Sequence, residues 1–313
     1  MKQLELFLHE ADMPDLYLTF KNVHKLSRQI FALEVDDRNN FYRYSRQPKC
    51  SDLVILSLAV SAEAIGLDSE NFLYAKIKSS YPQLFEMLPD RTNYNRRKRK
   101  LKEMIELLSS RLAKSMNTPN DMGIIDSMPL PVCRKARSSR LKILKEDMDM
   151  VPKTGYSPID KTYFHGYKLH CLIYPSGVIV NYCLTQGNVH DIHMMKPLTE
   201  GFLNHSTLIG DKGYIGRNAQ LELFQSSNIK VVTPPRKNQI IRPQWDWQYS
   251  KTRKRIETVF SQFCDQFLIK RNYARKFEGY ATRITAKLCA FTALQYINFL
   301  NNKPLNQVKY AMA

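Results

Sequence analysis

The sequence lacks any apolar stretch that could cross a lipid bilayer, and it has no recognisable leader segment. Its longest apolar run, residues 53–60, is far shorter than the roughly 20 residues that a membrane-spanning helix needs. The first 18 residues carry four acidic side chains, which a secretory signal peptide would not contain. These two absences predict a cytoplasmic protein without a membrane partner.

The six cysteines include no closely spaced pair. No Cys-x-x-Cys motif is present, although this spacing is typical of structural zinc sites and of redox-active disulfides. Scattered cysteines are typical of reduced thiols in an intracellular protein, and nothing in their spacing supports a zinc centre. They are Cys50, Cys133, Cys171, Cys183, Cys264 and Cys289.

Acidic residues are scarce relative to basic ones. Lysine and arginine total 47 against 29 aspartates and glutamates, which gives a formal net charge of +18. A surplus this large concerns binding partners rather than the fold, and it favours a polyanion such as nucleic acid. Hydrophobic residues make up 43% of the chain, which allows a sizeable core, and 313 residues suffice for one large or two ordinary domains.

The first 118 residues have the periodicity of helices. Apolar residues recur at helical spacing in residues 16–33 and again in residues 52–67. Ser51 and Asp52 are candidate caps for a helix over residues 53–65, which Gly66 would end, and a second helix is expected over residues 72–79. Two helices joined by a short turn outline a helix-turn-helix that binds DNA, but plain helical packing gives the same pattern.

A run of cationic residues precedes an apolar helical stripe. Arg96, Arg97, Lys98, Arg99 and Lys100 are consecutive, and the stripe that follows reaches Leu112. Such a run is either a solvated helix face or a surface that contacts DNA phosphates, and the net charge favours phosphate contact. The polar, turn-rich residues 113–121 then mark a domain boundary.

Three carboxylates occur in settings that suggest chemistry. Asp126 interrupts an apolar segment, residues 123–128, that two prolines follow, and Asp211 ends a second apolar strand flanked by glycines. Glu257 lies in a basic amphipathic helix, residues 251–268. Asp126 could also cap a turn before the prolines. If the three carboxylates converge, they can hold two divalent metal ions, which is the equipment for phosphodiester chemistry.

The second half of the chain alternates strands and helices. Residues 163–174 and 178–185 predict a hairpin around a Pro-Ser-Gly turn, and residues 135–161 are expected to form a basic loop. A helix then starts near residue 188. Its His190, Asp191 and His193 resemble a metal cluster, but spacings of one and two residues do not put all three on one helix face, so capping and solvation are the better interpretation.

The order of these elements outlines a fold. Three strands in a meander, followed by helix, strand, helix, strand and helix, predict an α/β ribonuclease H-like core, a mixed five-stranded sheet with flanking helices, preceded by an all-helical N-terminal domain. In this arrangement the strands of Asp126 and Asp211 are neighbours. The expected division is a DNA-binding domain over residues 1–118, a catalytic domain over residues 119–300 and a tail over residues 301–313.

These segments together resemble the DDE transposases of bacterial insertion sequences, and most closely the IS982 family. The resemblance covers most of residues 122–262 and is specific only as a set. The segments that carry it are Ile124–Cys133, Tyr163–His170, Gly187–Asp191, Gly210–Tyr214 and Ile256–Ser261.

The resemblance implies that Asp126, Asp211 and Glu257 are the catalytic carboxylates and the ligands of two Mg²⁺ ions, for which Mn²⁺ can substitute. Arg253, one helical turn before Glu257, matches an arginine of related transposases and is expected to contact DNA phosphate. Cys264 and Ser250 stand where relatives have a lysine and a tyrosine, so those two roles are not carried over.

The implied function is cleavage of phosphodiester bonds at the ends of an insertion sequence and transfer of the 3′-OH into target DNA. The implied partner is double-stranded DNA, both element ends and target, bound by a homo-oligomer in the bacterial nucleoid. Two alternatives stay open at this point. One is a ribonuclease H-like nuclease or resolvase that does not join strands, and the other is a non-catalytic DNA-binding protein derived from a transposase.

Overall fold

The structure is a computed structural model that describes residues 15–116, 121–158, 161–202, 205–236 and 245–311. The chain divides into two compact units. A helical unit contains residues 1–115, 265–274 and 278–313, and a sheet unit contains residues 116–264 and 275–277. Parts of the predicted boundary at 113–121 and of a basic segment at 236–247 lie outside the described residues.

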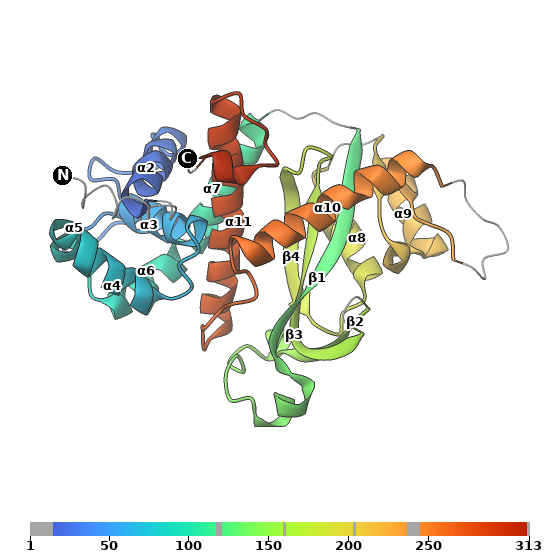
Figure 1. The fold of residues 1–313 in the computed structure, drawn as a ribbon, viewed down its shortest axis with the longest axis horizontal. Coiled ribbons are helices and arrows are strands. Elements are labelled where there is room, and N and C mark those ends of the chain that lie inside the picture. Colours follow the sequence, from blue (N-terminus) through green and yellow to red (C-terminus); the bar gives the residue numbers. More distant parts are fainter. Residues whose placement is uncertain (1–14, 117–120, 159–160, 203–204, 237–244, 312–313) are drawn as a thin grey trace, which may run out of the picture. The chain divides into compact units, whose positions relative to one another are not determined.

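The helical unit confirms the helices that the periodicity predicts. Its elements are α2 (Leu16–Ile30), α3 (Asp52–Ala64), α4 (Glu70–Ser80), α5 (Pro82–Met87), α6 (Arg91–Lys100), α7 (Lys102–Ser115) and α11 (Phe277–Leu300), as Figure 1 shows. The Ser51 hydroxyl accepts a hydrogen bond from the Val54 amide at the start of α3, and the Ser69 hydroxyl accepts one from Phe72 at the start of α4. Gly66 between them adopts a φ of +73°, a left-handed conformation that suits glycine.

The buried face of α11 joins it to the helical unit through an ion-pair cluster. Arg283 and Lys287 of α11 contact the two carboxylate oxygens of Glu63 in α3, at 2.9 Å and 2.5 Å. All three side chains are at most 5% exposed. Burial alone would raise the pKa of Glu63, but Arg283 and Lys287 lower it to about 2.

This grouping differs from the predicted domain boundaries. The sequence-based division placed α11 in a catalytic domain that ends at residue 300, followed by a tail. In the structure most of α11 belongs to the helical unit because its cations pair with Glu63. The predicted tail also packs onto that unit, since Val308 is fully buried and the Asn298 side chain donates hydrogen bonds to the carbonyls of Pro304 and Gln307.

The sheet unit is built on a mixed sheet that is five strands wide. Its strands are β1 (Met122–Arg134), β2 (Lys153–Ser157), β3 (Thr162–Ile173), β4 (Ile179–Gln186), β5 (Thr207–Ile209) and β6 (Lys230–Val232). The order across the sheet is β4-β3-β1-β5-β6, with β2 pairing with residues 162–166 of β3 and β4 with residues 167–173. The meander is antiparallel, whereas β1, β5 and β6 are parallel, which is consistent with a ribonuclease H-like outline.

The first strand continues through both prolines, whereas the sequence suggested that they end it. Pro129 and Pro131 lie opposite Lys168 and Gly166 of β3. Residues two apart in a strand direct their backbone nitrogens to the same edge, so both proline nitrogens lie on one edge of β1. On the edge away from β3, β1 pairs with β5 only as far as Ile124. The prolines therefore occupy a free edge, where a missing N–H costs no ladder hydrogen bond.

The basic segment after β1 is also more ordered than the predicted loop. It contains two short 3₁₀ helices, Lys135–Arg140 and Met148–Met150, and then β2. The Gln186 side chain donates a hydrogen bond to the Val151 carbonyl, and the Tyr167 hydroxyl donates one to the Met150 carbonyl. These contacts attach the segment to β3 and β4.

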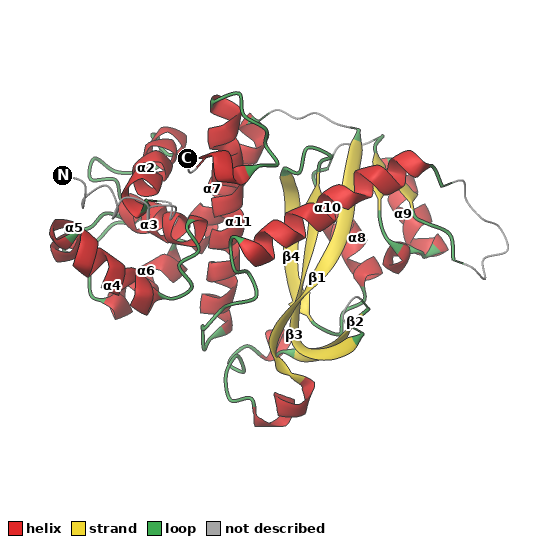
Figure 2. Ribbon diagram, viewed as in Figure 1, coloured by secondary structure: helices red, strands yellow, loops and turns green. Residues whose placement is uncertain are grey.

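Helices cover the sheet and position its polar edge. The helices are α8 (Met195–Thr199), α9 (Arg217–Ser227) and α10 (Trp247–Asp265). Met195, Leu198 and Leu223 of α8 and α9 pack on Ile125 and Leu172 of the sheet in one buried core. Figures 1 and 2 show α10 running across the strands.

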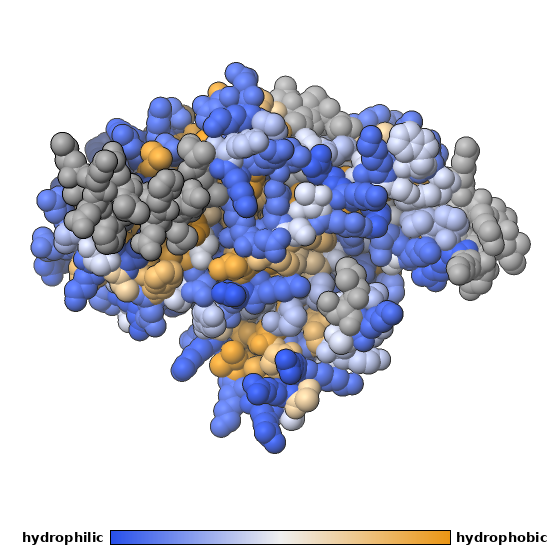
Figure 3. Space-filling view, viewed as in Figure 1, coloured by the Kyte–Doolittle hydropathy of each residue, from blue (hydrophilic) through white to orange (hydrophobic). Residues whose placement is uncertain are grey.

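No helix in the described part of the chain is long and apolar enough to cross a membrane. Most of the face drawn in Figure 3 is hydrophilic, with a few apolar patches between polar side chains.

We predict that Glu63→Ala strongly destabilises the helical unit. The substitution leaves Arg283 and Lys287 buried without a counter-ion, which should lower the free energy of unfolding by about 3–5 kcal/mol. Urea unfolding monitored by circular dichroism measures this loss. The control is Glu106→Ala, because Glu106 is half-exposed in α7 and its 3.6 Å ion pair with Lys102 lies at the surface, so its loss should be about 0–1 kcal/mol. Equal losses in the two variants would show that the buried cluster has no special weight.

Candidate active site

Asp126 lies on the central strand of the sheet unit. Its side chain is 19% exposed, and one carboxylate oxygen accepts a 2.8 Å hydrogen bond from the amide of Ser127. Ile124 and Ile125 before it are fully buried. The apolar part of β1 thus holds this carboxylate at the margin of the core, as the strand interpretation of the sequence expects.

Asp211 occupies the equivalent position after β5. It caps a short 3₁₀ helix, Lys212–Tyr214, and accepts a 2.7 Å hydrogen bond from the amide of Gly213. Its exposure is intermediate, and burial raises its pKa, with the nearby carboxylate of Asp191 adding to the shift.

The parallel register of β1 and β5 brings the two aspartates to one edge of the sheet. The last paired residues are Ile124 and Ile209, and each aspartate follows two residues later. Burial, together with the negative charge of Asp211, raises the pKa of Asp126 to about 7. The prediction that these two strands are neighbours is confirmed.

Arg253 connects Glu257 to this edge. Both residues lie on α10 one turn apart, and the Arg253 guanidinium is 2.5 Å from a Glu257 oxygen and 3.4 Å from an Asp126 oxygen. Glu257 itself is half-exposed. The structure therefore brings all three predicted carboxylates to one region, with the cation of Arg253 between Asp126 and Glu257.

The residues at this edge have the chemistry to bind a divalent cation, but in this structure they are not spaced to hold one. Carboxylate oxygens are the ligands that Mg²⁺ prefers. The pKa of Asp126 is raised first by burial and then by the negative charge of Asp211, and a bound cation would offset this second, repulsive contribution. Among the described residues, however, no group of three His, Cys, Asp or Glu side chains is close enough to hold a metal ion. Asp126 and Asp211 would supply two such carboxylates, whereas Glu257 would first have to leave Arg253.

Two further residues at the edge were not predicted. Asp191 accepts a 2.8 Å hydrogen bond from the Ser127 hydroxyl and pairs at 3.0 Å with Lys168 of β3. From the sequence alone, a cap or a solvated residue is the better interpretation of Asp191. The signal that could have found it is its place in the segment Gly187–Asp191, one of those that carry the family resemblance. Among the described residues, the structure shows no contact between its neighbours His190 and His193 and either Asp126 or Asp211.

The basic run at residues 96–100 does not form a single surface. Arg97 is buried and pairs at 2.6 Å with Asp52, and Lys98 is buried against Glu70. Arg99 pairs with Glu278, while Arg96 and Lys100 are exposed. The prediction of phosphate contact therefore fails for Arg97 and Lys98, whose cations neutralise carboxylates inside the helical unit.

A mixed sheet whose two parallel strands bring carboxylates together just past their last paired residues has the arrangement of an α/β enzyme site. Comparison with protein families agrees with this class. A family model described as "Transposase DDE domain" matches residues 117–293, more than half of the chain, so the protein belongs to the family of transposases with a DDE domain. This family consists of DNA-cleaving enzymes. Comparison with curated proteins and with solved structures finds no match.

We predict that Asp126→Asn stabilises the metal-free protein in a pH-dependent way. In the folded protein the pKa of this carboxyl group is raised from 3.8 to about 7, so between these pH values the folded state holds a proton that the unfolded chain has released. The free energy of unfolding therefore falls as the pH rises from 3.8 towards 7. At pH 8 the variant should be more stable by a few kcal/mol, at most about 4, and the difference should shrink as the pH falls towards 4.

Thermal melts in a chelator at several pH values measure this difference. Asp149→Asn is the matched control, since Asp149 is an exposed aspartate of the same unit. A stability gain for Asp126→Asn that does not vary with pH would contradict the raised pKa.

Proposed function

We propose that the protein is an insertion-sequence transposase of the IS982 type, which cleaves phosphodiester bonds at element ends and transfers the 3′-OH into target DNA. The observation that carries the proposal is the register of β1 and β5, which brings Asp126 and Asp211 to one edge of a chain that belongs to the DDE family. In this proposal double-stranded DNA is the substrate, and a homo-oligomer holds the two ends.

Asp126, Asp211 and Glu257 would be the catalytic carboxylates and would hold two Mg²⁺ ions, or Mn²⁺ in their place. When bound, such ions supply Lewis acidity for the attacked phosphate and for the departing oxygen. Asp126 is suited to the shared position because it lies close to both Asp211 and the Arg253–Glu257 pair. The carboxylates at this edge repel one another when they are ionised, and a bound cation would offset this repulsion. Ionisation of the carboxylates and ion binding are therefore coupled.

Arg253 would exchange its partners when DNA binds. Its guanidinium is 26% exposed and reaches both Asp126 and Glu257. A DNA phosphate offers a bidentate partner of the same charge. Transfer of Arg253 to the phosphate would free Glu257 as a ligand and would place the scissile strand beside the carboxylates.

The helical unit would supply further DNA contacts. The pair α3 and α4, with its short turn at Gly66, keeps the outline of a helix-turn-helix. Of the cationic run, Arg96 and Lys100 remain available at the surface, with Lys100 resting 4.9 Å from the ring centre of Tyr42. These two residues are the part of residues 96–100 that fits phosphate contact.

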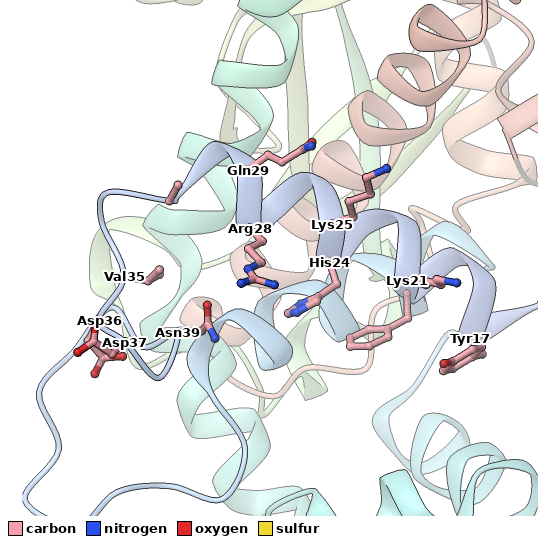
Figure 4. Close-up of a pocket in the computed structure, with 12 residues that line it drawn as sticks. Tyr17, Lys21, His24, Lys25, Arg28, Gln29, Val35, Asp36, Asp37 and Asn39 are labelled. Carbon is pink, nitrogen blue, oxygen red and sulfur yellow. The ribbon is translucent and has the colours of Figure 1, made fainter.

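A second cationic surface lies on α2. Lys21, Lys25 and Arg28 are exposed and border a hollow of about 800 Å³, which Figure 4 shows with Asp36 and Asp37 at one end. Their spacing of four and three residues aligns them along one face of the helix. A row of cations along one helix can contact successive phosphates of a DNA strand.

We predict that Asp126→Asn, Asp211→Asn and Glu257→Gln each abolish Mg²⁺-dependent cleavage of an element end, while DNA binding stays nearly intact. Each change removes one ligand charge but preserves side-chain volume. Cleavage of labelled DNA that carries the native terminal repeat measures the first property, and a mobility-shift titration measures the second. Cleavage retained in one variant would remove that residue from the catalytic set.

The same labelled ends separate transposition from plain hydrolysis. In a mixture with supercoiled target DNA, a transposase joins the labelled 3′ end to the target in a covalent product. Cleavage without joining would instead indicate a nuclease or resolvase, and binding without cleavage would indicate a protein that has lost catalysis.

We also predict that neutralising the exposed cations weakens DNA binding and its salt dependence. The variants are Arg96→Gln/Lys100→Gln and, separately, Lys21→Gln/Lys25→Gln/Arg28→Gln. Each lost phosphate contact should reduce the slope of log K against log salt by about 0.9. Fluorescence anisotropy between 50 and 200 mM salt, roughly the range in which such contacts dominate, measures the slope.

Arg97→Gln is the control for this experiment, because Arg97 is buried against Asp52. It should lower stability and leave the salt slope of the folded protein unchanged. An unchanged slope in either multiple variant would exclude that surface from the DNA interface.

A further inference from the structure

Asp191 is the meeting point of three elements of the sheet unit. Its Oδ1 atom accepts the Ser127 hydroxyl of β1 at 2.8 Å and the Lys168 ammonium of β3 at 3.0 Å. The same ammonium also donates to the Val189 carbonyl, two residues before Asp191. The short helix that carries Asp191 is thereby attached to β1 and β3 at once.

The contacts of Asp191 lie on the face of β1 opposite to Asp126. In the antiparallel ladder Ser127 faces His170 and Pro129 faces Lys168, so Ser127, His170 and Lys168 share one face. Asp126 is opposite Cys171 and belongs to the other face. Asp191 thus contacts the residue next to Asp126 from the opposite face of β1.

Asp191 also reaches the turn that carries Asp211. A Cβ atom added at Gly213 would come within 2.9 Å of an Asp211 oxygen and 3.1 Å of Asp191 Oδ2. Gly213 therefore fits between the two carboxylates, and its amide donates to Asp211. One side chain, Asp191, contacts β1 with one oxygen and faces the turn of Asp211 with the other.

Two buried polar atoms beside Asp191 show that this polar cluster is built into the core. His170 is fully buried, and its Nδ1 has no hydrogen-bond partner but lies 3.7 Å from Asp191 Oδ1. The fully buried Tyr214 hydroxyl also has no partner, and, after burial, the charges of Asp191, Asp126 and Asp211 raise its pKa. A buried polar group without a hydrogen-bond partner costs free energy, so two such groups beside Asp191 call for an explanation.

We infer that Asp191 is a positioning residue that, with Lys168 and Ser127, fixes the separation of Asp126 and Asp211 and so sets the affinity of the edge for divalent ions. Lys168 pairs with Asp191 at 3.0 Å and offsets part of its negative charge at this edge. The inference rests on the proposed function, because it assumes that Asp126 and Asp211 bind the ions.

The test is direct binding of Mn²⁺ to the 313-residue chain, in which electron paramagnetic resonance measures the concentration of the free ion. Asp191→Ala should weaken Mn²⁺ binding by roughly 10- to 100-fold, the usual effect of losing a residue that supports a ligand. Glu200→Gln, an exposed carboxylate nine residues further along the chain, is the control and should bind as the wild type does.

A second variant separates positioning from simple loss of charge. Asp191→Ala/Lys168→Met removes the whole ion pair and restores the net charge of the wild type. Positioning requires that this variant still binds Mn²⁺ at least about 10-fold more weakly. Wild-type affinity in the double variant would overturn the inference, because the effect of Asp191→Ala would then be through-space charge alone.

Ser127→Ala keeps the test decisive if the Asp191 variants do not fold. It removes only one hydroxyl that donates to Asp191, and a measurable weakening of Mn²⁺ binding is expected. Unchanged binding in a folded Ser127→Ala protein would count against the inference. Asp126→Asn serves as the reference, since intact Mn²⁺ binding there would mean that the proposed function fails, whatever Asp191 does.

Discussion

The candidate site depends on a short parallel ladder between β1 and β5. Only three residue pairs, ending at Ile124 and Ile209, hold the strands side by side, yet they bring two carboxylates that are 85 positions apart in the sequence to equivalent positions. Beyond this ladder, no strand among the described residues pairs with β1 on that edge, where the Asp211 turn begins. Burial of Asp126 raises its pKa, and repulsion between the two partly buried carboxylates raises it further. A fold that retains this repulsion needs compensation from cations.

The sheet unit provides two such cations from opposite sides. Arg253 on α10 reaches Asp126 and Glu257, and Lys168 on β3 pairs with Asp191. The two differ in how firmly they are held. Lys168 is 15% exposed and has a second acceptor in the Val189 carbonyl, whereas Arg253 is partly exposed and lies next to the half-exposed Glu257. The first is suited to permanent structure and the second to exchange with a DNA phosphate.

Local patterns predicted the elements better than they predicted the contacts between distant residues. The Ser51 cap of α3, the hairpin of β3 and β4, and the pairing of β1 with β5 follow from signals within a few residues or from the order of elements. Arg97 and Lys98 looked like a surface run because their partners, Asp52 and Glu70, are about 45 and 28 positions away. Asp191 was missed for the same reason, since its partners Ser127 and Lys168 lie on strands that only the sheet brings together.

The net charge of +18 therefore has two components with different physical roles. Cations such as Arg97, Arg283 and Lys287 are buried against carboxylates, and the pairing offsets part of the cost of desolvating both charges inside the helical unit. Cations such as Lys21, Lys25 and Lys100 are exposed, and their field extends into solvent, where a polyanion can meet it. A basic cluster in the sequence is consistent with either role, and the distinction depends on whether the fold brings a carboxylate to it. The same rule applies at the acidic edge, where Arg253 has carboxylate partners and remains partly exposed, which is consistent with its proposed exchange between structure and DNA contact.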